Sequence, residues 1–277
     1  MAPSSDASAS SEPRTALVTG ASSGIGLAFA QRLAKDGYRL ILVARRADRL
    51  EALAKEFGEK FGAGFEVFPA DLIRPEELLA VEERIAGEPA LELVVNNAGF
   101  GTAGAFADLD PDAEESEIRL NVLAVVRLAR AALPGMIERG RGAIINVSSM
   151  AGFNASPYMA TYAATKAFVN SFTEGLHEEL AGTGVKVQAL CPGFTRTEFQ
   201  DVARVEPDLP GFAWQEPDAV VDASLAALER GTLVVVPGLG NQAMAAVSGA
   251  LPRSWVRRVV GASMRRTLRP KGPPAAG

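Results

Sequence analysis

A tyrosine and a lysine that could exchange protons with a substrate lie in the stretch "SPYMATYAATKAF", residues 156–168. Tyr158, Tyr162 and Lys166 follow one another at intervals of four residues, so on a helix their side chains would share one face. An ammonium group near a phenol favours the phenolate, which would let the tyrosine act as a general acid and base. The alternative is the polar edge of an ordinary packed helix.

A glycine-rich turn near the start of the chain could hold the phosphates of a dinucleotide. The stretch "TALVTGASSGIGLAFAQRLA" predicts a strand, a turn and an amphipathic helix. Glycines permit a sharp turn and a close approach to a pyrophosphate, and the helix start offers free N–H groups. The Gly-Lys-Ser/Thr ending of a triphosphate site is absent, and a glycine turn without ligand is the alternative. The expected cofactor-binding residues here are Gly20, Ser22, Ser23, Gly24, Ile25 and Gly26.

Two arginines follow the second apolar run, "RLILVA", which ends at Ala44. Enzymes that prefer NAD carry an acid at this point for the ribose hydroxyls, whereas a cation accommodates a 2′-phosphate. Arg45 and Arg46 stand here, and the first acid is Asp48. The alternative is a pair of solvated arginines, although cations at a helix N-terminus oppose the helix dipole. The pattern favours NADP(H), with NAD(H) as the second choice.

The elements that must position these residues alternate between short apolar runs and longer helical patterns. Runs rich in β-branched residues predict strands at 15–19, 39–44, 64–70, 91–96, 142–148, 185–191 and 232–237. Helical patterns lie near 24–36, 47–57, 75–86, 112–133, 158–181 and 217–229. Strands this apolar are buried on both faces, so we expect a doubly wound α/β fold with a parallel sheet and helices on both faces.

Composition is that of an ordinary globular protein, with 277 residues, 48% hydrophobic and 22% charged. A single cysteine, Cys191, and a single histidine, His177, exclude an internal disulfide and argue against a metal site with soft ligands. No apolar run is expected to reach the length of a transmembrane helix, and the first residues lack the order of a signal peptide. We therefore expect a cytoplasmic protein and no bound metal.

Charge is unevenly distributed along the chain. The net charge is −5, but residues 231–277 contain seven cations and no acid, which leaves −12 for the rest. Residues 251–270 predict a basic amphipathic helix, for which docking on the acidic body or simple solvation is favoured over contact with an anionic membrane. No nucleic-acid recognition module is present. The expected organisation is a disordered tail at 1–13, a catalytic domain at 14–240 and a basic C-terminal extension at 241–277.

Five motifs in this order resemble the short-chain dehydrogenase/reductase family. They are "TGASSGIG" (19–26), "NNAG" (96–99), "NVSS" (146–149), "YAATK" (162–166) and "PGFTRT" (192–197). The resemblance covers roughly residues 14–237, and five ordered motifs are far more specific than one. It implies a seven-stranded Rossmann-like domain, a nicotinamide cofactor and a Ser–Tyr–Lys site assisted by an Asn. It also selects Tyr162 over Tyr158, because only Tyr162 stands four residues before Lys166 in the family pattern.

Carried over residue by residue, the resemblance assigns the catalytic positions to Asn121, Ser149, Tyr162 and Lys166. It places Asp71 near the adenine and a further set along the cofactor: Leu72, Asn97, Ala98, Gly99, Tyr162, Lys166, Pro192, Gly193, Thr195 and Thr197. The charges of Lys166 and of an oxidised nicotinamide would together lower the pKa of Tyr162.

Each of these roles has a structural alternative. Asp71 could cap a helix, Asn121 could be a helix asparagine satisfied by backbone groups, and the threonines could be ordinary loop residues. Ser148 is the neighbouring alternative to Ser149, but alternation along the strand would point it away from the site.

The substrate is expected to be a small apolar ketone, aldehyde or alcohol. Residues 194–216 form a turn-rich stretch after the sixth predicted strand, where a lid over the substrate would lie. The aromatic and apolar residues that could line the pocket are Phe100, Met150, Phe153, Phe194, Phe199, Phe212 and Trp214.

We therefore expect an NADP(H)-dependent oxidoreductase that interconverts a carbonyl compound and an alcohol, with Tyr162 as general acid and base. A non-catalytic dinucleotide-binding regulator on the same fold is the alternative. The resemblance also implies a homodimer or homotetramer assembled through the helix at 112–133 and the helix that carries Tyr162.

Overall fold

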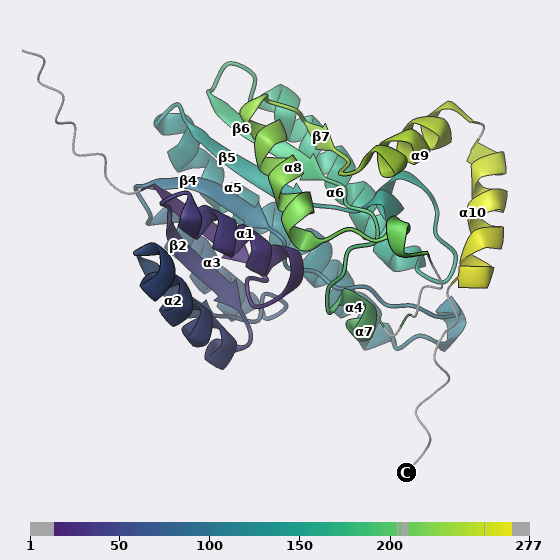
Figure 1. Ribbon diagram of the computed structural model, residues 1–277, viewed down its shortest axis with the longest axis horizontal. Helices are drawn as coiled ribbons and strands as arrows, with labels where there is room; N and C mark the ends of the chain where they lie inside the picture. Colours follow the sequence, from purple (N-terminus) through teal and green to yellow (C-terminus); the bar gives the residue numbers. More distant parts are fainter. Residues whose placement is uncertain (1–13, 204, 206–209, 252, 268–277) are drawn as a thin grey trace, which may run out of the picture.

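The computed structural model describes residues 14–203, 205, 210–251 and 253–267; the predicted tail at 1–13 lies outside this range. Seven parallel strands form one sheet in the order β3-β2-β1-β4-β5-β6-β7 (Figure 1). The strands are β1 (Thr15–Thr19), β2 (Arg39–Ala44), β3 (Phe65–Pro69), β4 (Leu91–Asn96), β5 (Gly142–Val147), β6 (Val185–Leu190) and β7 (Val234–Val235). The predicted doubly wound α/β fold is confirmed.

Helices cover both faces of the sheet, which explains why the strands are apolar at successive positions rather than at alternate ones. One face carries α1 (Gly24–Lys35), α2 (Ala47–Phe61) and α8 (Pro217–Glu229). The other carries α3 (Pro75–Ala86), α5 (Val125–Glu138) and α6 (Ala160–Glu179). Within β1, Ala16 and Val18 point to the first face and Leu17 to the second.

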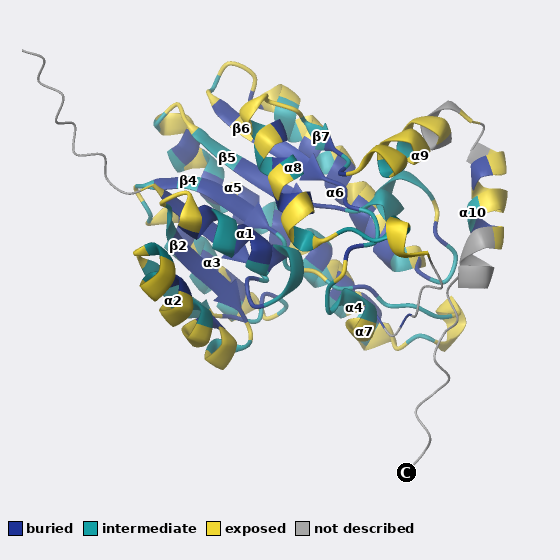
Figure 2. Cartoon of the chain, viewed as in Figure 1, coloured by how far each residue is buried: buried dark blue, intermediate teal, exposed yellow. Residues whose placement is uncertain are grey.

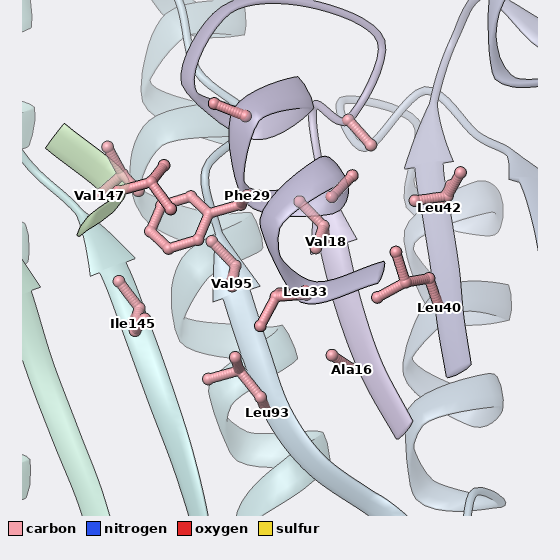
Figure 3. Packing of buried hydrophobic residues seen from close by; sticks show 14 of the residues in the cluster. Ala16, Val18, Phe29, Leu33, Leu40, Leu42, Leu93, Val95, Ile145 and Val147 are labelled. Carbon is pink, nitrogen blue, oxygen red and sulfur yellow. The ribbon is translucent and has the colours of Figure 1, made fainter. Parts of the chain in front are cut away.

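Phe29 of α1 anchors the first of these two cores. Its ring lies among Val18, Leu33, Val95 and Val147 at the centre of the sheet (Figure 3). The side chain is 0% exposed, and α1 begins directly at the glycine turn. Packing of this ring therefore also holds the N-terminus of α1 against the ends of the strands.

Most element boundaries agree with the sequence prediction, and the long helix predicted at 112–133 differs most. It consists of α4 (Pro111–Ile118), a π-helical segment η2 (Arg119–Ala124) and α5. The helix predicted to start at residue 158 begins only at Ala160. Tyr158 has a positive φ of 67°, so the expectation that Tyr158 shares a helical face with Tyr162 and Lys166 is wrong.

The continuous helical stretch Pro111–Glu138 contradicts one expectation from the sequence. Its 28 residues include a window of mean hydropathy 1.5, which is long and apolar enough to cross a membrane. In the folded chain 39% of that window is buried, and α5 packs on β4, β5 and α3. The buried part of this stretch belongs to the core beside the sheet, while Ile118, Leu123 and Ile137 stay exposed.

The chain after the sheet adds two helices, α9 (Leu239–Ala250), which contacts the turn at Met150–Phe153, and α10 (Arg253–Thr267) (Figure 1). Asn241 of α9 donates hydrogen bonds to Gln215 Oε1 at 3.1 Å and to the Pro237 carbonyl at 3.0 Å. On α10, Trp255 is 66% exposed while Val256 is buried (Figure 2). The basic segment is helical as predicted, and its docking partner stays a prediction.

Replacement of Phe29 by alanine is expected to lower the free energy of unfolding by roughly 3–5 kcal/mol, because it leaves a cavity in the core. Chemical denaturation followed by circular dichroism measures this loss. The matched control is Phe212→Ala, since Phe212 is 91% exposed and its loss should cost about 0.5 kcal/mol or less. Similar losses for the two variants would contradict the assignment of Phe29 to the core.

Candidate active site

The predicted site residues gather at one edge of the sheet, where the parallel strands end. Gly20 follows β1, Asn97 follows β4, Ser149 lies just after β5 and Pro192 just after β6. The strand order reverses between β1 and β4, and ligands of doubly wound sheets bind at such a reversal. The topology thus brings together residues that are up to 172 positions apart in the sequence.

The glycine turn leaves no room for side chains. Gly20 and Gly24 have positive φ values of 66° and 57°, which L side chains rarely adopt. A Cβ on Gly26 would lie 2.3 Å from the Gly20 carbonyl oxygen. The cap residue Ser23 makes no side-chain cap bond, and the first turn of α1 contains no acid. The backbone N–H groups and the positive dipole end of α1 therefore suit an anion.

Hydrogen bonds hold the loop after β4 beside this turn. Asn97 Nδ2 donates to the Thr19 carbonyl at 2.9 Å, while Thr19 Oγ1 accepts the backbone N–H groups of Asn97 and Ala98 at 2.9 and 3.0 Å. The loop after β6 reaches the same place, since a Cβ on Gly24 would lie 3.0 Å from Thr197 Cγ2. Three loops thus meet around the start of α1.

Arg46 binds both serines of the glycine turn. Its Nη2 donates to Ser22 Oγ at 2.9 Å and Ser23 Oγ at 3.0 Å, and its Nη1 contacts Glu198 Oε2 at 2.9 Å. The other oxygen of Glu198 contacts Arg49 at 2.7 Å. Hydrogen bonds from Arg49 and Arg46 lower the pKa of Glu198 to about 2. The carboxylate of Glu198 is therefore bound to the guanidinium of Arg46, which was predicted to bind a 2′-phosphate.

The other predicted cofactor residues are spread along the same edge. Arg45 is exposed at the end of β2. Asp71 does not cap α3, whose cap position is Arg74; its Oδ1 accepts the Ile73 N–H at 3.1 Å. Leu72 is buried beside it.

The motif after β6 folds back on itself. Thr195 is buried and its Oγ1 donates to the Gly193 carbonyl at 3.1 Å, while Thr197 Oγ1 accepts the Phe199 N–H at 3.2 Å. Pro192 is buried at the start of this segment.

Tyr162 and Lys166 lie together and are buried on the first turns of α6. Lys166 Nζ is 5.7 Å from the centre of the Tyr162 ring and donates to the Val147 carbonyl at 2.8 Å. Tyr162 is 9% and Lys166 5% exposed. A Cβ on Gly99 would lie 3.5 Å from Lys166 Nζ, so the lysine borders the loop after β4. The predicted association of the two side chains is present.

Burial dominates the protonation of this pair. It raises the pKa of Tyr162 to about 12, against a hydrogen bond from Ser149 that lowers it. It lowers the pKa of Lys166 to about 8, although Glu117 and Cys191 act in the opposite direction. The predicted fall in the Tyr162 pKa involves a bound nicotinamide as well and stays a prediction; in the protein chain alone, burial acts in the opposite direction.

The two serines at the end of β5 point to different partners. Ser149 hydrogen-bonds with Tyr162, and its Oγ also accepts the Ala151 N–H at 3.1 Å at the start of the 3₁₀ turn η3 (Met150–Phe153). Ser148 is buried and donates to the Lys166 carbonyl at 3.0 Å. The expectation that Ser149 rather than Ser148 faces Tyr162 agrees with this geometry.

Asn121 is fully buried within η2 and connects that helix to two parts of the site. Its Nδ2 donates to the Phe100 carbonyl at 2.8 Å and to Thr165 Oγ1 at 3.2 Å. Its Oδ1 accepts the Phe100 N–H at 3.2 Å. Asn121 lies in a π-helical segment, which interrupts the regular hydrogen-bond pattern of the α-helix. Such segments are frequent at functional sites. The alternative of an asparagine satisfied by backbone groups is met in part, because Phe100 supplies two backbone partners while Thr165 of α6 supplies a side-chain partner.

Sequence reasoning missed two buried acids on α4. Glu117 is 0% exposed and Glu114 9% exposed, and both contact Thr102 in the loop after β4. A signal was present, because Glu117 stands four residues before Asn121 and so shares its helical face.

The predicted lid contributes one aromatic side chain to the site. Phe199, at the start of α7 (Phe199–Val202), lies with its ring centre 5.2 Å from that of Tyr162. Trp214 instead packs on Phe194 at 5.8 Å, and Phe212 is 91% exposed. Residues 204 and 206–209 of this stretch lie outside the described part of the chain.

Comparison with known proteins agrees with this architecture. Residues 14–207 match the family model for short chain dehydrogenases. A very-long-chain 3-oxoacyl-CoA reductase from Anas platyrhynchos is 34% identical over 87% of this chain and 73% of its own length.

Two solved structures are also similar. A short-chain dehydrogenase from Sphingobium yanoikuyae in complex with NADPH is 38% identical with a TM-score of 0.79, covering 87% of this chain and 97% of its own. A bulky-bulky ketone specific alcohol dehydrogenase from Comamonas testosteroni is 34% identical with a TM-score of 0.75, covering 87% and 96%. With a family model matched from β1 to the lid, this chain belongs to the short-chain dehydrogenase/reductase family of oxidoreductases.

Proposed function

We propose that this protein is an NADP(H)-dependent oxidoreductase that interconverts an apolar carbonyl compound and its alcohol, with Tyr162 as the proton donor and acceptor. The observation that carries the proposal is the buried pair of Tyr162 and Lys166, with the half-buried Ser149 beside Tyr162, at the edge of the sheet where the strand order reverses between β1 and β4. A phenol, an ammonium group and a hydroxyl in one dry site suit proton transfer to a substrate oxygen.

The residues present fit a dinucleotide phosphate. The glycine turn excludes side chains from the start of α1, and the first turn of that helix carries no acid. Arg46, which also donates to Ser22 and Ser23, already holds an anionic group, the Glu198 carboxylate. A 2′-phosphate offers Arg46 the same charge-assisted hydrogen bonds as that carboxylate. This supports NADP(H) over NAD(H), and the NADPH complex of the Sphingobium yanoikuyae relative agrees with it.

In the proposed reaction the dinucleotide supplies or accepts the hydride, and the protein handles the proton. Ser149 and Tyr162 hold the substrate oxygen by hydrogen bonds, which positions the carbonyl carbon for reduction. During reduction the Tyr162 hydroxyl gives its proton to the oxygen. Lys166, fixed by the Val147 carbonyl, stabilises the phenolate that remains. Asn121 keeps the loop after β4 in place beside the lysine.

The substrate side of the site is apolar. Phe199 packs on Tyr162, and a Cβ on Gly101 would lie 2.9 Å from the Tyr162 ring and 3.1 Å from that of Phe199. Side chains of this kind favour a hydrocarbon group beside the reacting carbonyl. Names of the relatives point the same way, since one acts on bulky ketones and another is a very-long-chain 3-oxoacyl-CoA reductase.

An apolar groove supports the proposal of a homo-oligomer. The groove measures about 660 Å³ and runs across α4, η2, α5 and α6. Three of its lining residues are large and 41–48% exposed: Ile118, Leu123 and Phe168. The charged residues that line the groove are Glu115 and Arg119. In a dimer with a two-fold axis, Glu115 of one copy could lie next to Arg119 of the other, so like charges need not meet. A second copy of this chain is the proposed occupant.

Tyr162→Phe is expected to lower kcat/KM for ketone reduction by roughly 10²–10⁴-fold, because the ring keeps its packing and loses the transferable proton. The measurement is NADPH oxidation with ketones graded by size and hydrophobicity. NADPH affinity, followed by cofactor fluorescence, should stay unchanged. Tyr38→Phe is the control, since Tyr38 lies at the far end of α1. Equal turnover by the wild type and Tyr162→Phe would refute the catalytic role of Tyr162, and a wild type without turnover on any ketone would favour the non-catalytic regulator.

Arg46→Ala is expected to raise the Kd for NADPH about tenfold or more, through the loss of charge-assisted hydrogen bonds to the 2′-phosphate. Isothermal titration or fluorescence quenching measures this Kd. NADH is the internal control, because it has no 2′-phosphate and its Kd should change little in the same variant. A parallel loss of affinity for both cofactors would argue against the 2′-phosphate role.

Leu123→Glu is expected to convert the oligomer to monomer, since it places a charge in the apolar groove. Light scattering coupled to size-exclusion chromatography gives the mass of both proteins at micromolar concentration. Leu239→Glu is the control, as Leu239 is 83% exposed on α9, away from the groove. A wild-type protein that is monomeric throughout would refute the proposed assembly.

A further inference from the structure

The two helices after the sheet carry a dense set of exposed apolar side chains. Six large ones lie between residues 239 and 259, and their exposed fractions range from 45% to 83%. They are called here the C-terminal patch: Leu239, Met244, Val247, Leu251, Trp255 and Val259. Figure 2 shows exposed surface along both helices. Single exposed apolar residues are ordinary, but a group of this size marks a surface that binds a partner.

Helix α9 is exposed around most of its circumference and yet has no charged residue, since its sequence is LGNQAMAAVSGA. Of residues 239–247, Asn241 and Ala245 are half-buried and the others are exposed. At helical spacing, Leu239 and Val247 lie on the side opposite these two. A helix that faces water presents charged or polar side chains on its outer face. The outer face of α9 therefore suits an apolar environment.

Helix α10 combines apolar and basic side chains on its exposed side. Trp255 is 66% and Val259 70% exposed, and a spacing of four residues puts them on one face. Arg258 borders that face, and Arg257 is exposed next to it. Residues 231–277 contain seven cations and no acid, so this part of the chain is uniformly positive. Tryptophan is the side chain that best suits a boundary between hydrocarbon and water.

Helix α9 attaches the C-terminal patch to loops that border the candidate site. It contacts η3, which starts directly after Ser149. Asn241 donates to Gln215 Oε1 at 3.1 Å, at the end of the predicted lid. A Cβ on Gly193, in the loop after β6, would lie 2.5 Å from Asn241 Nδ2. The patch is therefore fixed to the loops after β5 and β6, on the side of the site where the lid lies.

We propose that the C-terminal patch and the arginines of α10 form a surface that binds an anionic lipid bilayer. The apolar side chains enter the boundary between headgroups and hydrocarbon, and the arginines pair with lipid phosphates. Residues 231–277 carry +7 and the rest of the chain −12, so an anionic bilayer attracts the C-terminal helices and repels the opposite end. This charge distribution turns the patch toward the lipid.

Two other occupants fit this surface less well. A second copy of the chain on the same patch would bring two positive segments together, and like charges oppose that contact. The acidic body of the same chain, which the sequence favoured as the partner, leaves Trp255 and Val259 exposed. An anionic bilayer satisfies both the apolar and the basic side chains at once.

Vesicle sedimentation with the full chain tests the proposal. The wild type is expected to sediment with vesicles of phosphatidylcholine and phosphatidylglycerol, and to remain in solution with phosphatidylcholine alone. Trp255→Ser should raise the lipid concentration for half-maximal binding about tenfold or more, because it removes apolar area that enters the bilayer. Leu79→Ser is the matched control, since Leu79 is 46% exposed on α3 and its loss should leave binding unchanged.

The basic side chains are tested in the same assay. Arg257→Gln combined with Arg258→Gln should weaken binding to the mixed vesicles about tenfold or more, because two cations near the headgroups are lost. Lys55→Gln combined with Lys60→Gln is the matched control, since it removes two exposed cations from α2. Equal losses in the two double variants would overturn a specific role of α10. Thermal melting verifies that each variant is folded.

Trp255 also reports its own position. The chain has two tryptophans, so Trp214→Phe leaves Trp255 as the only one. With mixed vesicles its emission should shift to shorter wavelength, and brominated acyl chains should quench it. Sedimentation without shift or quenching would overturn the proposal, because another part of the chain would then hold the vesicle. This measurement decides the matter even if Trp255→Ser fails to fold.

Other results would also overturn the proposal. A wild type that stays in solution with both kinds of vesicle refutes lipid binding, and equal binding to both kinds refutes the need for anionic lipid. Light scattering without lipid in which Trp255→Ser lowers the mass of the protein would assign the patch to a second copy. None of these measurements uses turnover. An active Tyr162→Phe variant would therefore refute the proposed function and leave the result on lipid binding unaffected.

Discussion

The burial of an ammonium group next to a phenol is the constraint on which the rest of this structure depends. Lys166 is almost completely removed from water, and such a group stays charged only where the protein supplies acceptors and negative charge. The Val147 carbonyl at 2.8 Å and the acid on α4 supply both. Because these partners come from β5 and α4, the sheet and the long helix must be correctly packed before the pair can function.

The helix formed by α4 and η2 serves the site through a row of polar side chains on one face. Glu117 holds Thr102 and Asn121 holds Phe100, so the loop after β4 is fixed at two points two residues apart. That loop carries Gly99 and Gly101, which border Lys166 and Tyr162. The same helix presents an apolar groove on its outer side. A single stretch of chain therefore connects the reaction centre to the proposed interface between copies.

The sequence allowed the sheet, the order of its helices and the association of Tyr162 with Lys166 to be predicted. Apolar runs and glycine turns are local signals, and they locate β1, β2 and β4 to the residue. Tyr158 was misplaced because its backbone leaves the helical region, which spacing alone does not reveal. Glu117 and Glu198 were missed because their roles depend on which distant residue each meets. The rise that burial causes in the pKa of Tyr162 could not be predicted, because burial cannot be read from spacing.

The contact between Glu198 and Arg46 has a consequence for how a phosphorylated ligand enters. An incoming phosphate must compete for Arg46 with the carboxylate of Glu198, which Arg46 and Arg49 already bind. Entry is then an exchange of anions, in which the phosphate replaces the carboxylate of Glu198, a residue of the predicted lid. Salt screens the ion pair that is broken, between Glu198 and the arginines, as well as the new pair between Arg46 and the phosphate. Ligand affinity should consequently vary less with ionic strength than the number of basic side chains around the entrance would suggest.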